Sequence, residues 1–396
     1  MRIGFLFNHD QIHQIAHSLP IAIRLAEAKT GAEIVVATTS DRLRDEVEQL
    51  ADDAIGPGLR LQPLRLRRPL SRLLAQLAGR LAPATKLLIY RDNLDFFRSL
   101  DILVVTEKTS LILKSRYRLD ALKIVHTRHG AGDRAIGFDA ASAKFDHVLV
   151  SGAKVRERLI AEAGVAPSAI SVVGYPKFDL FAPVGKQTSA GAERRPVVLY
   201  NPHVSPHLSS WYTMGRDVLD WFVDRPDYEL IFAPHVMLFE RPFVTTVDRL
   251  RLAFPGRIGK RVRRAPNIHI DLGSRASTTM EYLNRADFYL GDVSSQVYEF
   301  LIRPRPCVFL NAHGFHWQDD VNFAVWQAGP VIDKVADLGD ALSEAQARHR
   351  SDYAPVQRRL FDASFDLSET PSASRAAAAI AAFAGLSWPS GRDHRP

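Results

Sequence analysis

Short runs of apolar, often β-branched residues alternate with helical stretches along the first half of the chain. Residues 2–7 and 33–38 are typical of buried strands, and a helix is expected between them from 12 to 28, broken early by Pro20. Strand, helix and strand with short connections predict a parallel α/β sheet that begins at the N-terminus. Three more strands of the same kind are expected at 101–106, 123–127 and 147–151.

A polar, glycine-bearing stretch at 185–191 interrupts this pattern and predicts a domain boundary. A second series follows, with strands expected at 196–200, 228–233, 268–270, 288–290 and 307–310, and helices such as 216–223 and 297–302. An alanine-rich helix is expected at 372–384. We therefore predict an α/β protein of two doubly wound domains that face a cleft, over 1–184 and 192–345, with a helical tail over 346–396.

Composition narrows the class of protein. The 396 residues are 46% hydrophobic and 24% charged, which is globular and excludes a disordered chain. Cys307 is the only cysteine, so an intramolecular disulfide and a thiolate metal site are both excluded. No apolar run reaches the roughly 20 residues that span a bilayer, and the N-terminus lacks a signal peptide's apolar region. We expect a cytoplasmic protein, soluble or peripheral to the inner face of the cytoplasmic membrane.

The net charge of +7 is concentrated in one segment, because residues 59–91 hold eight basic residues and no acid. Leucines recur there at helical spacing, at Leu70, Leu73, Leu74, Leu77 and Leu81. One hypothesis is that they enter the headgroup boundary of an anionic membrane, with Arg65, Arg67, Arg68 and Arg72 facing the lipid. The alternative is that the leucines pack on the sheet and the arginines are solvated. A nucleic-acid partner is not expected, because the segment lacks interleaved aromatic residues.

Candidate chemistry lies where the expected strands end, since parallel sheets bind ligands at the carboxyl ends of their strands. After 123–127 comes a glycine-rich loop with Arg128, His129, Gly130 and Arg134. Glycine lets backbone approach a ligand, and His129 titrates near neutral pH, so it can remove a hydroxyl proton. A plain turn with a hydrogen-bonded histidine is the alternative.

Three later junctions carry further candidates. His235 follows 228–233, where it can donate to a phosphate or simply be a satisfied loop residue. Asp292, Ser294 and Ser295 precede a helix that holds Glu299, which predicts either an anion site or ordinary helix caps. The loop after the first strand of the second half is a candidate for the cleft or a rigid proline turn, and it holds Tyr200, Asn201, Pro202 and His203.

His9, His13 and His17 repeat every four residues, which would place them on one helix face. No carboxylate completes a metal site there, and the chain has no Asp-x-Asp pair placed to hold a cation on a nucleotide. We therefore expect neither metal nor cofactor, and we place His9 and His13 on the side of an acceptor.

Taken in order, these junctions resemble the CDP-glycerol glycerophosphotransferase family, the teichoic-acid type polymerases and primases with a GT-B fold. The likeness rests on 128–130, 174–179, 200–203, His235 and 291–299. It implies two Rossmann-like domains, with the acceptor on the N-terminal domain and a CDP-linked donor on the second. It further implies that His129 is the base on the acceptor hydroxyl, that His235 with Ser294 and Ser295 binds the donor diphosphate, and that Glu299 holds ribose or glycerol.

The resulting hypothesis is a metal-independent transferase that moves glycerophosphate, or a related group, to a hydroxyl or phosphate of a membrane-associated lipid or glycan. Catalysis would consist of stabilising the leaving nucleotide and positioning the acceptor. The alternatives are a GT-B glycosyltransferase that uses a sugar nucleotide, an epimerase on the same scaffold, and a non-catalytic basic protein that binds membrane or nucleic acid.

Overall fold

The computed structural model describes residues 1–8, 12–51, 54–56, 58–77, 82–128, 130–181, 194–240, 242–246 and 251–389. The chain forms two compact units. Unit 1 comprises Met1–His129, Phe138–Ala182 and Phe365–Pro396, and unit 2 comprises Gly130–Gly137 and Pro183–Ser364. The boundary expected at 185–191 lies outside the described residues. The expected tail is shared between the units, since its last part belongs to unit 1 and its first part to unit 2.

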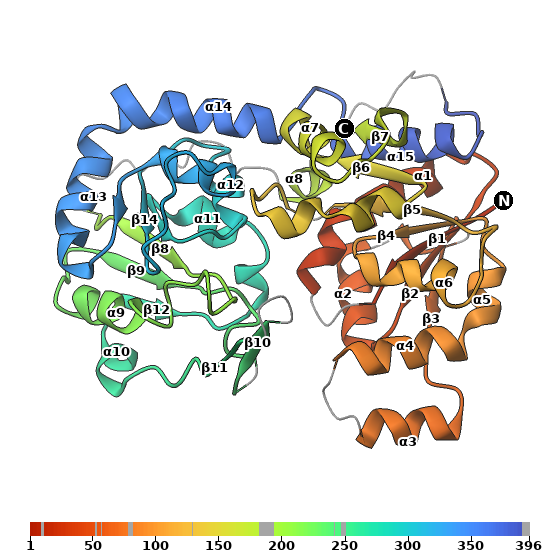
Figure 1. Ribbon diagram of the computed structural model, residues 1–396, viewed down its shortest axis with the longest axis horizontal. Coiled ribbons are helices and arrows are strands. Elements are labelled where there is room, and N and C mark those ends of the chain that lie inside the picture. Colours follow the sequence, from red (N-terminus) through yellow and green to blue (C-terminus); the bar gives the residue numbers. More distant parts are fainter. Residues whose placement is uncertain are drawn as a thin grey trace. The chain divides into compact units, whose positions relative to one another are not determined.

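In its described part, unit 1 holds a seven-stranded parallel sheet in the order β3-β2-β1-β4-β5-β6-β7 (Figure 1). Its strands are β1 (Arg2–Phe7), β2 (Glu33–Thr38), β3 (Leu59–Pro63), β4 (Ile102–Val105), β5 (Lys123–Thr127), β6 (His147–Val150) and β7 (Ile170–Val172). The predicted strands are confirmed to within a residue or so at their ends, whereas β3 and β7 were not expected. β3 is only partly buried, so its apolar signal is weak.

The helices of unit 1 are α1 (Leu19–Glu27), α2 (Asp41–Ala51), α3 (Pro69–Leu77), α4 (Ala82–Asp92), α5 (Leu94–Arg98), α6 (Ile112–Ser115), α7 (Ala153–Ala161), α8 (Pro176–Leu180) and α15 (Ser372–Phe383). The helix expected at 12–28 is broken near Pro20, as predicted. Its first part is the 3-10 helix η1 (Ile12–His17), and Pro20 lies in the first turn of α1. Proline lacks the N–H that a helix interior requires, but the first turn does not need it.

Asp179, at the end of the 174–179 motif, holds the C-terminal helix. Its carboxylate accepts from the backbone N–H of Ser372 at 3.2 Å and of Ala373 at 2.6 Å, where α15 begins. The apolar face of α15 then packs against α1 in the core of unit 1, with Ala376, Ala377 and Ile380 fully buried. The last residues of unit 1 are therefore part of its core.

In its described part, unit 2 holds a six-stranded parallel sheet in the order β12-β9-β8-β13-β14-β15, and a separate antiparallel hairpin. The sheet consists of β8 (Val197–Asn201), β9 (Glu229–Phe232), β12 (Ile268–Ile270), β13 (Phe288–Gly291), β14 (Cys307–Leu310) and β15 (Val331–Ile332), and the hairpin of β10 (Val244–Thr246) and β11 (Arg251–Ala253). The helices are α9 (Gly215–Val223), α10 (Lys260–Arg264), α11 (Glu281–Arg285), α12 (Gln296–Phe300), α13 (Leu338–Ala347) and α14 (Ala354–Ser364).

Both sheets have the same strand order, in which the first strand lies between the second and the fourth strand of that sheet. In unit 1 this places β1 between β2 and β4, and in unit 2 it places β8 between β9 and β13. Such a doubly wound sheet binds ligands where the strand order reverses, at the carboxyl ends of the two central strands. In unit 2 that position is occupied by the loops after β8 and β13. Among the described residues, no helix is long and apolar enough to cross a bilayer.

Candidate nucleotide site at the switch point of unit 2

The loops after β8 and β13 are joined by the buried carboxylate of Asp292. Its Oδ1 accepts from the backbone N–H of His203 at 3.0 Å, and its Oδ2 accepts from the N–H and the hydroxyl of Ser210 at 2.7 and 2.9 Å. The carbonyl of Asp292 accepts from the indole N–H of Trp326 at 3.0 Å. The side chain of Asp292 therefore organises the loop that carries His203.

Burial raises the pKa of Asp292 to about 6, while the hydrogen bonds from Ser210 and His203 act in the opposite direction. Removing a carboxylate from water disfavours its charged form, and donors that point at the oxygens favour it. The pKa of Asp292 therefore lies between the ordinary carboxyl value and neutral pH. The carboxylate of Asp292 accepts backbone N–H groups from His203, Ser210 and Val293, and the role predicted for it in binding the donor stays a prediction.

His203 is buried and held in one tautomer. Its Nδ1 accepts from the N–H of Ser205 at 2.9 Å, so the ring proton of the neutral imidazole lies on Nε2. Burial lowers its pKa well below the ordinary value, and the charges of Arg134, His235 and His207 lower it further. At neutral pH, His203 is thus a neutral donor through Nε2–H.

His235 follows β9 and repeats this arrangement beside His203. The Nδ1 of its ring accepts from the backbone N–H of Met237 at 3.3 Å. The backbone N–H of His235 donates to the carbonyl of Pro202 at 3.0 Å. The two imidazole rings lie 5.9 Å apart between centroids. The ends of β8 and β9 therefore present two neighbouring Nε2–H groups, of which that of His235 is on a partly exposed side chain.

The glycine-rich segment Gly130–Gly137 belongs to unit 2, although the chain on both sides of it belongs to unit 1. Asp133 attaches it: the buried carboxylate accepts from the hydroxyl of Tyr298 at 2.6 Å and from the N–H of Val325 at 3.2 Å. This attachment brings Arg134 close enough to His203 to depress the pKa of that imidazole. The positive charge of the Arg134 guanidinium therefore lies near the histidine pair.

Two glycines of this segment lie against Ser295. A Cβ on Gly132 would be 3.0 Å from the Cβ of Ser295, and one on Gly130 would be 3.3 Å from its Oγ. Gly130 also has a φ of +83°, a left-handed conformation that other residues rarely adopt. Both glycines are therefore required for the close approach of this backbone to the start of α12.

The serine turn is built as the sequence predicted, but its helix is short. Ser295 is exposed and immediately precedes α12, whereas Ser294 is buried and its Oγ accepts from the N–H of Gln296 at 3.4 Å. Glu299 is buried within α12. Because α12 has only five residues, its dipole is small.

The remaining candidates, at the end of β8 and directly after it, contact buried groups of unit 2. Tyr200 is fully buried in the core of unit 2, with its hydroxyl 2.9 Å from the Oγ of Ser210. Asn201 is buried and donates through Nδ2 to the carbonyl of Ala233 at 2.6 Å. Pro202 contributes its carbonyl to His235. These three residues join the ends of β8 and β9 and thereby fix the two histidines.

Several candidates of the first half are not placed by the structure. His129 and His9 lie outside the described residues, and His13 lies in η1 with its side chain outside them. Within unit 1, Arg128 stacks on the ring of Phe138 at 4.6 Å, and Arg158 lies over the same ring at 4.0 Å. Burial and the charge of Arg158 lower the pKa of Arg128 to about 10.

Sequence analysis missed the residues that assemble this site, namely Asp133, Ser210, Tyr298 and Trp326. Each acts through a partner far along the chain, such as the 165 residues between Asp133 and Tyr298. No local pattern marks such a pair. Among the described residues, no group of three or more His, Cys, Asp or Glu side chains is placed to hold a metal ion.

Comparison with known proteins places the chain by fold. No family model and no curated protein sequence matches it. A putative UDP-N-acetylglucosamine 2-epimerase from Listeria monocytogenes is 14% identical with a TM-score of 0.54, over 98% of both chains. The wall teichoic acid polymerase TagF, in a crystal of its H444N variant soaked with CDPG, is 14% identical with a TM-score of 0.58, over 96% of this chain and 87% of TagF.

A third similar structure is MnaA from S. aureus with UDP, which is 12% identical with a TM-score of 0.57, over 99% of this chain and 100% of MnaA. At these identities the likeness concerns the fold, and it extends over nearly the whole chain. The predicted fold class is confirmed: this chain has an α/β fold of two doubly wound, Rossmann-like sheets, of the GT-B type, as in these structural neighbours.

Proposed function

We propose that the protein is a GT-B-type transferase that binds the diphosphate of a nucleotide-linked donor at the switch point of unit 2. The observation that carries this proposal is the histidine pair His203 and His235, whose Nδ1 atoms both accept backbone N–H groups, together with Arg134 beside His203. An imidazole whose Nδ1 accepts a hydrogen bond has Nε2–H to donate to a phosphate oxygen, and the guanidinium supplies the positive charge.

These groups would act on the leaving nucleotide. When the bond between the transferred group and the diphosphate breaks, negative charge develops on the diphosphate oxygens, and preorganised donors stabilise it. Asp292, Ser210 and Asp133 keep the donors in place before the substrate arrives. Ser295 and the bare backbone of Gly130 and Gly132 would lie against the donor, and Glu299 would act on its ribose or glycerol.

For the substrates, we propose glycerophosphate transfer from a CDP-linked donor to a membrane-associated lipid or glycan, with His129 as the base and without a metal. The ordered motifs and the similarity to TagF, which was soaked with CDPG, support this choice. A sugar-nucleotide reaction is the second candidate, because MnaA and a cyanobacterial protein, HepE, were both crystallised with UDP. The protein would work at the inner face of the cytoplasmic membrane.

A pair of substitutions at His235 tests the donor site. His235→Asn keeps an acceptor near Nδ1 and loses the Nε2–H donor, so we expect it to weaken binding of a CDP-linked donor by about 10- to 100-fold. His235→Gln can retain a donor near Nε2 and should weaken binding less. Titration calorimetry with CDP-glycerol and with UDP-sugars measures both, with His269→Asn as the control because His269, in β12, hydrogen-bonds to Tyr282 of α11.

The same titrations decide between the two substrate classes. Tighter binding of UDP-sugars than of CDP-glycerol to the wild-type protein would favour the second candidate. Unchanged affinity for every nucleotide in His235→Asn would remove the switch point of unit 2 from the proposal.

A further inference from the structure

Helix α3 (Pro69–Leu77) presents a row of exposed leucines. The exposed fractions are 59% for Leu70, 51% for Leu73, 40% for Leu74 and 76% for Leu77. Their spacing places them on one face of the helix. The alternative that the leucines pack on the sheet is therefore wrong for these four, while Leu81 lies outside the described residues.

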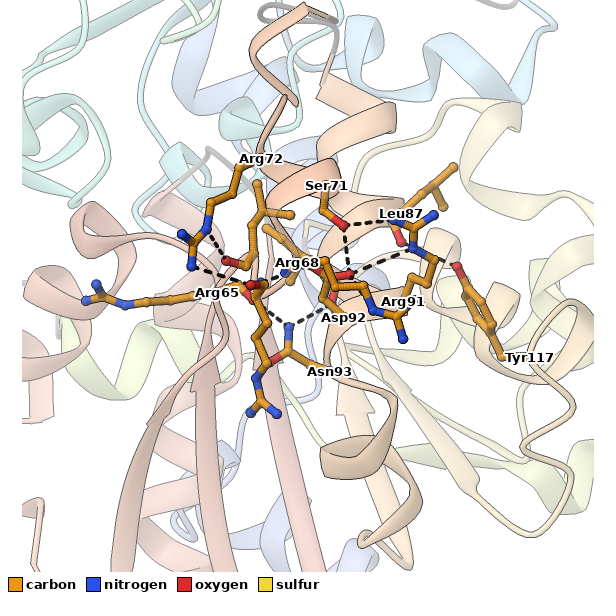
Figure 2. Close-up of polar contacts among 12 residues, drawn as sticks. Arg65, Arg68, Ser71, Arg72, Leu87, Arg91, Asp92, Asn93 and Tyr117 are labelled. Carbon is orange, nitrogen blue, oxygen red and sulfur yellow. Dashed lines mark hydrogen bonds and ion pairs between the residues drawn. The ribbon is translucent and has the colours of Figure 1, made fainter. Parts of the chain in front are cut away.

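Another face of α3 holds the helix to its unit. The hydroxyl of Ser71, which is fully buried, donates to Oδ1 of Asp92 at 2.8 Å, and the N–H groups of Arg67 and Arg68 each donate to Oδ2 at 2.9 Å (Figure 2). Arg91 donates to the Oγ of Ser71 at 2.8 Å. Asp92 thus caps the start of α3 from the end of α4, and the leucines are turned outward. In Figure 1, α3 lies at the outer end of unit 1, beyond α4.

The charge around this apolar face is positive. Arg65, Arg67 and Arg68 are exposed at the start of α3. The nearest acid that follows them in the sequence, Asp92, is buried, accepts three hydrogen bonds from Arg67, Arg68 and Ser71, and forms ion pairs with Arg68 and Arg91. Arg72 is used within the fold, because its guanidinium donates to the carbonyls of Leu66 and Arg67.

We propose that α3 is a docking helix for an anionic membrane surface. Leucines on one face enter the boundary between headgroups and acyl chains, and the arginines at its start meet anionic headgroups. This docking role rests on the proposed function, because that function supplies the membrane-associated acceptor. It adds the surface that would bring unit 1 to that acceptor. The docking itself requires no nucleotide.

Vesicle flotation tests this inference with the full chain. We expect the wild type to float with vesicles that contain phosphatidylglycerol at low salt, to be released at high salt, and to stay behind with phosphatidylcholine alone. Leu73→Gln with Leu77→Gln should lower the vesicle partition coefficient by about tenfold or more, because the removed side chains are the apolar contact. The matched control is Leu367→Gln with Val321→Gln, two exposed apolar residues outside α3.

Charge reversal tests the contribution of the arginines to membrane binding. Arg65→Glu with Arg67→Glu should abolish binding at low salt, whereas Lys144→Glu with Arg350→Glu, the same change of net charge elsewhere, should leave most of it. The substitution at Arg65 also breaks its ion pair with Asp41, but both side chains are 66% exposed and such pairs contribute little to stability. Thermal melting and calorimetric binding of CDP-glycerol confirm that each variant is folded.

Three results would overturn the inference: no flotation of the wild type at low salt, equal binding to both kinds of vesicle, or unchanged binding in the leucine variant. A dimer in sedimentation velocity that the leucine variant dissolves, without vesicle binding, would assign the face to a second copy of the chain instead. Vesicle binding without nucleotide binding would contradict the proposed function alone.

Discussion

At the scale of single residues, the candidate site depends on two buried carboxylates that accept hydrogen bonds from other parts of the chain. Asp133 and Asp292 both connect segments far apart in the sequence, and their oxygens accept backbone N–H groups as well as hydroxyls. A buried donor left without its acceptor costs about 1–3 kcal/mol. Substitutions of these residues should therefore affect stability and the geometry of the histidine pair together.

We predict that Asp133→Asn and Tyr298→Phe each lower the free energy of unfolding by about 1–3 kcal/mol. The double variant should lose less than the sum, because both changes remove the same hydrogen bond. Urea denaturation of the full chain measures all three, and Asp319→Asn on the exposed surface is the control. Strict additivity would show that the two side chains do not act on each other.

The pKa of Asp292 leads to a pH dependence. In the folded protein it is raised from 3.8 to about 6, so between these values the folded state keeps a proton that the unfolded state has lost. The unfolded state then binds fewer protons, and this group lowers the free energy of unfolding as the pH rises, by roughly 3 kcal/mol in total.

Urea denaturation of the wild type and of Asp292→Asn between pH 4 and 7 isolates this contribution. We expect the wild type's advantage over the variant to shrink from about pH 4 to pH 6 and then to level off. A difference that stays constant over this range would show that Asp292 titrates in the folded protein as it does in the unfolded chain.

At the scale of elements, two helices are capped by residues from elsewhere in the chain. Asp92 caps α3, and Asp179 caps α15. The alanine-rich run predicts the bounds of α15 to within a residue, but no local motif identifies either capping residue, because both lie outside the helix that they stabilise. The motif at 174–179, which supports the family resemblance, also performs this structural task in unit 1.

We predict that Asp179→Ala lowers the free energy of unfolding by about 1–2 kcal/mol, the usual effect of losing a helix cap. The change should loosen α15 first, so limited proteolysis should cut the chain near residue 370 faster than in the wild type. Asp120→Ala, at an exposed position of the same unit, is the control. Equal cleavage rates in both variants would show that the two N–H bonds do not hold α15.

At the scale of the whole molecule, the two sheets repeat one topology. Some segments that are adjacent in the sequence belong to different units. Gly130–Gly137 belongs to unit 2 although it follows β5 of unit 1, and α14 and α15 belong to different units. Sequence analysis assigned the glycine-rich loop to the first domain, because the chain continues there on both sides. Its place becomes apparent from tertiary contacts, such as those of Asp133 with Tyr298 and Val325 and of Gly132 with Ser295.

The sequence by itself determined the α/β class, most of the strands and the junctions where candidate residues lie. Parallel strands are buried on both faces, so they appear as short apolar runs, and their carboxyl ends must share an edge. β15 escaped prediction because its two residues form no such run.

Only the tertiary structure decided which way the side chains point. Tyr200 and Asp292 face inward, the imidazoles of His203 and His235 lie side by side, and the leucines of α3 face outward. Helical spacing shows that leucines share a face, but not whether a neighbour covers it. Those orientations depend on contacts between residues about 20 to 190 positions apart, which local periodicity does not encode.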